Sequence, residues 1–236
     1  MRTLFRKLIA LATALAFVST TWPFGWFNPL LKHGNGAGGG GITYLVNENC
    51  EGTGTPSGWS ADDPGVNWDF TSTVLNGSQS WHTSQAGGAV SYYNLGTGYT
   101  EIYGFQLVQF VSSVSGTQFF TARNAANNAT IFSITASGSD IVIGDSAGGT
   151  ASTSLANITT GVKYWVWFHY RSGSGANAIG EIWVSTTSTK PGGGAGYNIF
   201  SNGGGTLAFQ IAAWGSWSGS HDVILDDFKL AQSSIP

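Results

Sequence analysis

The sequence predicts an all-β protein, an antiparallel β-sandwich of about a dozen strands. Gly and aromatic residues are abundant in the 236-residue chain, whereas charged residues make up only 9% of it. Short stretches of alternating apolar and polar residues recur along the chain, separated by clusters of Gly, Ser, Asn and Asp, which is the pattern of strands joined by turns. After the N-terminus, no segment shows the Glu-, Lys-, Leu- and Ala-rich periodicity of long helices.

The first residues are typical of a signal peptide. Arg2, Arg6 and Lys7 precede an apolar run, residues 8–18, which has the length of a signal-peptide core and is short for a membrane span. We therefore expect residues 1–20 to direct secretion to the cell surface or the surroundings, with membrane contact only during export. An uncleaved anchor is the alternative.

Residues 21–41 are expected to be a linker. The first part is aromatic and contains Pro, and the second part is so rich in Gly that it cannot compensate its ordering entropy by burial. The remaining residues, 42–236, are expected to form one domain, because about 195 residues is a common size for all-β domains.

The strands of this domain are predicted in chain order from alternation. They are expected at residues 42–47, 66–73, 89–93, 101–111, 117–122, 129–135, 140–144, 206–214 and 221–230. Residues 163–186 are expected to form a hairpin, because the intervening sequence SGSGANA suits a turn and not a helix.

The predicted hairpin is apolar on both faces of its first strand. Two sets of side chains alternate along it: Tyr164, Val166, Phe168 and Tyr170 on one face, and Trp165, Trp167 and His169 on the other. Neither face is suited to water, so we expect a second sheet against one face and a flat apolar group, from the protein or from a ligand, against the other.

Charge and cysteine content exclude some functions. From Gly41 onward the chain has twelve acidic and five basic residues, which leaves a formal charge of −7. Nucleic acid is a disfavoured partner, because its binding requires a basic stripe. Cys50 is the only cysteine, so no intrachain disulfide can form, and we expect it to be a small buried residue.

Three motifs span nearly the whole domain. They are Glu51-Gly52 with Pro56-x-Gly58-Trp59, then Gly161-x-Lys163-Tyr164-Trp165-Val166-Trp167, and finally Ile224-Leu225-Asp226-Asp227-Phe228-Lys229-Leu230. In their order and spacing the domain resembles the concanavalin A-like lectin/glucanase superfamily, the jelly-roll group that includes laminin-G-like modules. The resemblance implies a jelly roll, and it implies carbohydrate as the class of ligand.

The sequence lacks the catalytic patterns of this superfamily. Its glucan-cleaving members present a Glu-x-Asp-x-Glu cluster, because hydrolysis needs two carboxylates across the scissile bond; here Glu101 and Glu181 are isolated. Lyase members have a Gln-x-His strand, whereas Gln106 is followed by Leu and Val. We therefore expect no catalytic residues. A hydrolase or lyase remains an alternative only if Glu101 and Glu181 converge in the fold.

The expected ligand site is aromatic. Sugar rings stack on indoles, while their hydroxyls need polar anchors at the rim. The candidate ligand-binding residues are Trp165, Trp167, His169 and Trp183 on the hairpin, with Trp214 and Trp217 at the rim, in the loop between the last two strands. The alternative is that the hairpin tryptophans belong to the core.

Asp226 and Glu51 are candidate ligands of a structural Ca²⁺ ion. Strand alternation places Asp226 on one face with Ile224 and Phe228, where an unpaired carboxylate is costly to bury. Related jelly rolls often bind Ca²⁺ where the first and last strands meet, through an early Glu and a late Asp, and the resemblance implies such a site. The alternative is that backbone N–H groups satisfy Asp226.

These observations favour a secreted, non-catalytic, lectin-like module that binds an oligosaccharide or polysaccharide. The alternative is a structural or adhesion module of a surface layer or of a phage-associated particle.

Overall fold

The computed structural model describes residues 41–52, 54–61, 69–71, 73–83, 89–112, 114–153, 158–203, 205–216 and 222–236. The predicted signal peptide, all but the last residue of the predicted linker, and Trp217 lie outside these residues. Within them, no helix has the length and apolar character needed to cross a membrane.

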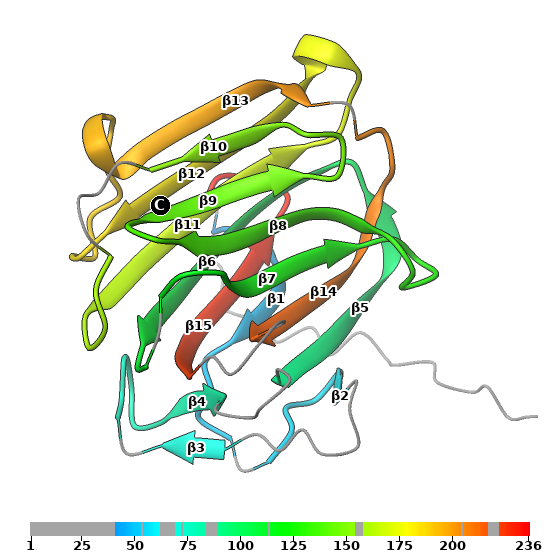
Figure 1. Cartoon of the computed structure of the whole chain (residues 1–236). Helices are drawn as coiled ribbons and strands as arrows, with labels where there is room; N and C mark the ends of the chain where they lie inside the picture. Colours follow the sequence, from blue (N-terminus) through cyan, green and yellow to red (C-terminus); the bar gives the residue numbers. More distant parts are fainter. Residues whose placement is uncertain are drawn as a thin grey trace, which may run out of the picture. The chain divides into compact units, whose positions relative to one another are not determined.

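The described residues form two antiparallel sheets packed face to face, which confirms the predicted all-β sandwich (Figure 1). The strands are β1 (Tyr44–Glu48), β2 (Trp59–Ala61), β3 (Asp69–Thr71), β4 (Ser80–Thr83), β5 (Ala89–Tyr99), β6 (Glu101–Phe110), β7 (Thr117–Arg123), β8 (Thr130–Ser137), β9 (Asp140–Asp145), β10 (Thr150–Ser152), β11 (Lys163–Arg171), β12 (Ala178–Ser185), β13 (Tyr197–Gly203), β14 (Phe209–Ser216) and β15 (Val223–Ala231). Two 3-10 turns, Gly175–Asn177 and Gly194–Gly196, precede β12 and β13.

Each sheet combines strands that are consecutive in the sequence with strands that are distant in it. The eight-stranded sheet has the order β13-β12-β11-β6-β15-β4-β3, with β1 paired to β15, and the seven-stranded sheet has the order β10-β9-β8-β7-β14-β5-β2. Each predicted strand is found. The strands β2, β4, β10 and β13 are additional: the first three have only three or four residues, and β13 contains the Asn and Gly residues of a turn. Their pairing partners, not local alternation, make them strands.

The core lies between the sheets and is largely aromatic. Tyr164, Val166, Phe168 and Tyr170 of β11 point into it, as alternation predicts. Phe132 of β8 stacks on Tyr170, with ring centroids 4.4 Å apart. Cys50 is free and fully buried in this core, which confirms the expectation for it.

Trp214 is also a core residue. It lies inside β14 and is fully buried, with its ring stacked on Phe228 at a centroid distance of 5.0 Å. Its Nε1 donates a hydrogen bond to Gln106 Oε1 over 2.8 Å. The expected loop position at the rim of a ligand site is therefore wrong, because β14 continues to Ser216 and carries the indole into the sandwich.

A β-bulge in β15 changes the faces predicted for the last strand. The register against β6 shifts between Asp226 and Lys229, and Asp227 has a φ of 50°. Asp226 pairs with Leu107 and faces outward, whereas Phe228 points into the core. The predicted common face for Asp226 and Phe228 is wrong, because strict alternation cannot reveal the extra residue of a bulge.

Candidate functional site

The outer face of the eight-stranded sheet carries four of the predicted ligand-binding residues. Cross-strand register aligns them in rows that run across β13, β12, β11 and β6. One row contains Ile199, Glu181, His169 and Tyr103, and the next contains Tyr197, Trp183, Trp167 and Phe105. Trp165 follows in a third row, opposite Leu107.

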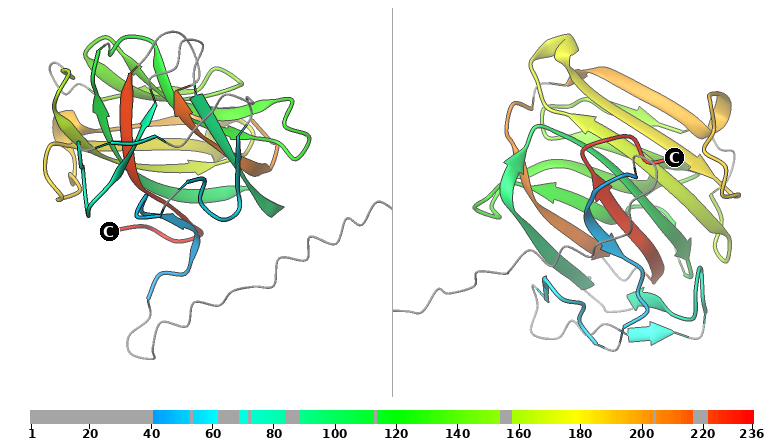
Figure 2. Two further views of the ribbon diagram at one scale, coloured as in Figure 1. Left: turned by 90° about the horizontal axis from the view of Figure 1, so that it is seen from below. Right: turned by 180° about the vertical axis from the view of Figure 1, so that it is seen from behind.

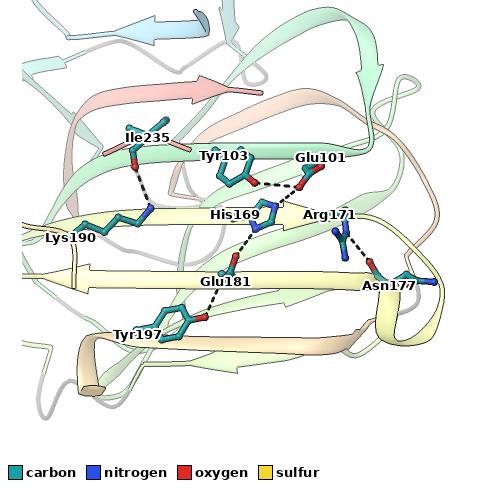
Figure 3. A network of polar contacts seen from close by, with 9 residues as sticks. All are labelled: Glu101, Tyr103, His169, Arg171, Asn177, Glu181, Lys190, Tyr197 and Ile235. Atoms are coloured by element: carbon teal, nitrogen blue, oxygen red, sulfur yellow. Dashed lines mark hydrogen bonds and ion pairs between the residues drawn. The ribbon is translucent and has the colours of Figure 1, made fainter. Parts of the chain in front are cut away.

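At the centre of this face, His169 lies between two glutamates from the neighbouring strands (Figure 3). Its Nδ1 is 2.6 Å from Glu181 Oε2, and its Nε2 is 2.9 Å from Glu101 Oε1. The ring stacks on Tyr103, with centroids 4.1 Å apart and planes within 2°. Because ionised carboxylates only accept hydrogen bonds, a ring nitrogen that carries a proton donates to the carboxylate beside it. His169 therefore positions Glu101 and Glu181 together.

Two tyrosines extend this network. Tyr197 donates from its hydroxyl to Glu181 Oε1 over 2.9 Å, and Tyr103 donates to Glu101 Oε1 over 3.4 Å. Burial, followed by the hydrogen bond and charge of Glu181, raises the pKa of Tyr197 to about 12. Burial and Glu101 raise the pKa of Tyr103 as well. Both phenols thus remain protonated at neutral pH and act as donors.

The network is open to solvent on the Glu101 side. The side chain of Glu101 is 43% exposed, against 7% for His169. Among the described residues, Glu101 Oε2 has no hydrogen-bond partner. Arg171, opposite Glu101 on β11, donates through Nε to Asn177 O over 3.1 Å and leaves its terminal nitrogens unpaired within the described part of the chain. A free acceptor and free donors therefore lie on neighbouring strands, at the same register position.

Aromatic rings continue the face beyond the network. Trp183 stacks on Tyr197 with centroids 5.2 Å apart, and Lys190 Nζ lies 4.0 Å from the centroid of the Trp183 ring. Trp165 has Lys163 Nζ at 4.3 Å from its ring centroid. Both tryptophans are half-buried. The predicted residues Trp165, His169 and Trp183 thus share one partly accessible surface.

The C-terminal segment, residues 232–236, lies over this face (Figure 2, right). Trp167 lies beneath it and is buried. Ile235 is buried in the same apolar cluster as Trp167 and Phe105. Trp167 Nε1 donates to Pro236 O over 2.9 Å, and Lys190 Nζ donates to Ile235 O over 3.2 Å. Part of the flat apolar group expected against the outer face is therefore the protein's own chain.

Asp226, a predicted calcium ligand, is fully buried and holds the turn that precedes β4. Its Oδ2 accepts hydrogen bonds from Asn76 N at 2.9 Å and Ser80 Oγ at 2.8 Å, and its Oδ1 accepts one from Asp227 N at 2.7 Å. Burial raises the pKa of Asp226 to about 7 despite these donors, and the charge of Asp227 adds to the increase.

Glu51, the other predicted calcium ligand, is exposed and binds the same turn. It accepts hydrogen bonds from Ser78 N at 2.7 Å and from the Ser78 hydroxyl. Ca²⁺ requires six to eight oxygen ligands, whereas both carboxylates face N–H and O–H donors. Across the described ranges, no group of three or more His, Cys, Asp or Glu could hold a metal ion. This donor set does not fit a calcium site as arranged, and calcium binding stays a prediction.

The network joins residues that sequence patterns do not connect. Glu101, His169 and Glu181 occupy outward positions of their strands, which alternation indicates, but only the strand order β6-β11-β12 brings them together. Tyr197 lies on β13, a strand that alternation does not predict. Convergence of Glu101 and Glu181 in the fold was the condition for considering cleavage of a glycan, and the structure brings both to His169.

No family model and no curated protein sequence matches this chain. Solved structures do resemble its fold. An endo-β-1,4-glucuronan lyase from the fungus Trichoderma reesei aligns with a TM-score of 0.57 at 13% identity, over 81% of this chain and 96% of that chain. The globular domain of T. cruzi calreticulin aligns with a TM-score of 0.52 at 10% identity, over 81% of this chain and 88% of that chain. At such identities the similarity shows a shared β-sandwich of the jelly-roll type.

Proposed function

We propose that this protein is a secreted, non-catalytic carbohydrate-binding module of the concanavalin A-like kind, and that its ligand contacts the outer face of the eight-stranded sheet. The observation that carries the proposal is the network in which His169 holds Glu101 and Glu181 beside the half-buried rings of Trp183 and Tyr197. The three sequence motifs and the jelly-roll sandwich support the superfamily assignment.

The chemistry of this face is complementary to a sugar. A pyranose has an apolar C–H face and a rim of hydroxyls that donate and accept hydrogen bonds. Tyr103 and Trp183 supply partly accessible aromatic rings, Glu101 Oε2 supplies an acceptor, and Arg171 supplies donors. Because His169 already holds Glu101 in place, binding orders few additional side chains, and preorganisation of this kind favours affinity.

Cleavage of a glycan is the second candidate, because Glu101 and Glu181 converge. In a hydrolase, however, two carboxylates flank the scissile bond across open space, whereas the imidazole of His169 lies between these two. A lyase needs a base that removes a proton from the sugar ring, and the raised pKa values of Tyr103 and Tyr197 keep both phenols protonated. These features favour binding over cleavage.

A polysaccharide panel tests the proposal. The full chain would be screened by affinity electrophoresis against neutral, amino-sugar and uronic-acid polysaccharides, together with Glu101→Gln, Glu181→Gln and the control Asp140→Asn, which lies in the other sheet. We expect one polysaccharide class to bind and each glutamate variant to bind about tenfold more weakly, since a lost charge-assisted hydrogen bond costs roughly 1.5–3 kcal/mol. Asp140→Asn should bind like the unchanged protein.

Three other outcomes would contradict this assignment. Equal binding by the glutamate variants would place the site elsewhere on the molecule. Binding to no polysaccharide would favour the structural or adhesion module. Release of unsaturated products or new reducing ends, lost in Glu101→Gln, would show that the network cleaves its ligand.

A further inference from the structure

The C-terminal segment occupies a part of the outer face that is continuous with the His169 network. Trp167 precedes His169 by two residues on β11, so their side chains point the same way about 7 Å apart along the strand. Phe105 lies beside Trp167 on β6, with ring centroids 5.2 Å apart. Ile235 covers this pair and is only 4% exposed.

We infer that residues 232–236 form a displaceable strap over a second sugar subsite, whose floor is made by Trp167 and Phe105. The inference rests on the proposed function, because it assigns this subsite to an oligosaccharide that already contacts Glu101 and His169. In the free protein the strap fills the subsite, and a saccharide long enough to extend from the network replaces it.

The strap is held by few contacts. The strand β15 ends at Ala231, and Gln232, Ser233 and Ser234 are exposed. Ile235 is the only buried side chain among residues 232–236. The backbone N–H groups of this segment make no hydrogen bonds within the described residues. Displacing the strap therefore breaks no sheet pairing and leaves the sandwich core intact.

A sugar can replace each contact that the strap makes. Trp167 Nε1 and Lys190 Nζ now donate to the carbonyls of residues 235 and 236, and hydroxyl oxygens of a sugar accept from the same two donors. The C–H face of a pyranose can take the place of Ile235 against the Trp167 ring. Without strap or sugar, Trp167 and Phe105 would be exposed to water, which explains why the strap closes in the free protein.

The experiment compares the full chain with two variants, a truncation after Ala231 and Ile235→Ser, with Ser233→Ala as the control on the exposed side of the strap. Each protein would first be titrated with 1-anilinonaphthalene-8-sulfonate, which reports an uncovered apolar face. Affinities would then be measured for the disaccharide and the hexasaccharide prepared from the polysaccharide that the panel selects. Cooperative thermal melting would verify that each variant is folded.

We expect the truncation and Ile235→Ser to bind the dye and to bind the hexasaccharide about tenfold more tightly, because a competing closed state lowers apparent affinity by the fraction of open molecules. The disaccharide affinity should not change, and Ser233→Ala should match the unchanged protein. If the truncated chain does not fold, Ile235→Ser alone decides the result.

Unchanged or weaker hexasaccharide binding by folded Ile235→Ser, with normal disaccharide binding, would overturn the strap and leave the proposed function standing. If none of the proteins binds a saccharide, the proposed function is overturned. The proposed competition between the strap and a saccharide is then overturned as well.

Discussion

His169 and Asp226 are both buried ionisable side chains on the outer side of the eight-stranded sheet, but their surroundings differ. His169 lies between two carboxylates, each within hydrogen-bond distance of one of its ring nitrogens. Asp226 is surrounded by neutral donors and has Asp227 as its neighbour. A buried charge is tolerated when it is paired and costly when it is not. The first arrangement suits a ligand site, and the second predicts a dependence of stability on pH.

Asp226 should make the folded protein more stable at pH 5 than at pH 8. Burial first, and then the charge of Asp227, raises the pKa of Asp226 to about 7, compared with an ordinary value of about 3.9 in the unfolded chain. The folded state thus binds the proton more tightly, and the free energy of unfolding falls as the pH rises through this interval. We expect the Asp226 contribution to fall by roughly 2–3 kcal/mol between pH 5 and pH 8.

Urea denaturation at the two pH values measures this change, and Asp226→Asn is the control that removes the titrating group. The difference between pH 5 and pH 8 should shrink in Asp226→Asn. An equal difference in both proteins would assign the pH dependence to other groups.

Thermal melting in Ca²⁺ and in EDTA tests the calcium prediction. Asp226 and Glu51 already accept hydrogen bonds from the turn at residues 76–80. We therefore expect the melting midpoints in Ca²⁺ and in EDTA to lie within about 1 °C of each other, because an ion that does not bind the folded state does not stabilise it. A higher midpoint in Ca²⁺ that disappears in Asp226→Asn would show that the turn rearranges around the ion, and it would support the site predicted from the sequence.

At the scale of the elements, two strand glycines allow large rings to cross a neighbouring strand. Gly104 on β6 lies opposite Phe168 on β11, and Gly180 on β12 lies opposite Phe200 on β13. A Cβ at these glycines would lie 1.9 Å from the Phe168 ring and 2.2 Å from the Phe200 ring. These close contacts position β11 and β12, and therefore the strands that carry His169 and Glu181.

The substitution Gly104→Ala should destabilise the protein by about 1–3 kcal/mol, the range for overpacking a close-packed core. Phe168 is 1% exposed and has no room to move aside. The matched control is Gly144→Ala on β9, because a Cβ there would lie an ordinary 3.5 Å from Thr150. Urea denaturation of both variants measures the effect, and equal losses of stability would contradict the steric explanation.

At the scale of the whole molecule, residues Gly41–Pro236 form one compact unit, while the signal peptide and the linker stay predictions. The unit places the polar network, the half-buried tryptophans and the C-terminal segment on one side of one sheet. The proposed ligand site therefore lies on a single face of the molecule.

Export should remove the N-terminal residues. When the chain is expressed in a secreting bacterial host, mass spectrometry of the culture medium should find a protein that begins after Ala16 or near Ser19 and Thr20, since small residues mark a cleavage site. A charge in the apolar run, Leu11→Arg, should keep the chain inside the cell. A full-length chain in the membrane fraction would instead show an uncleaved anchor.

The sequence by itself determined the fold class, the principal strands and the two faces of β11, because alternation records which side chains point to the core. It also placed Trp165, Trp167 and His169 on one face of that strand, but it left open whether the hairpin tryptophans belong to the core. Only the tertiary structure decided that Glu101 and Glu181 meet at His169, that Asp226 and Phe228 lie on opposite faces of the sheet, and that the C-terminal segment covers Trp167. These features depend on strand order, on a bulge and on contacts between distant residues. Alternation within a strand contains no information about them, because it describes each strand without its neighbours.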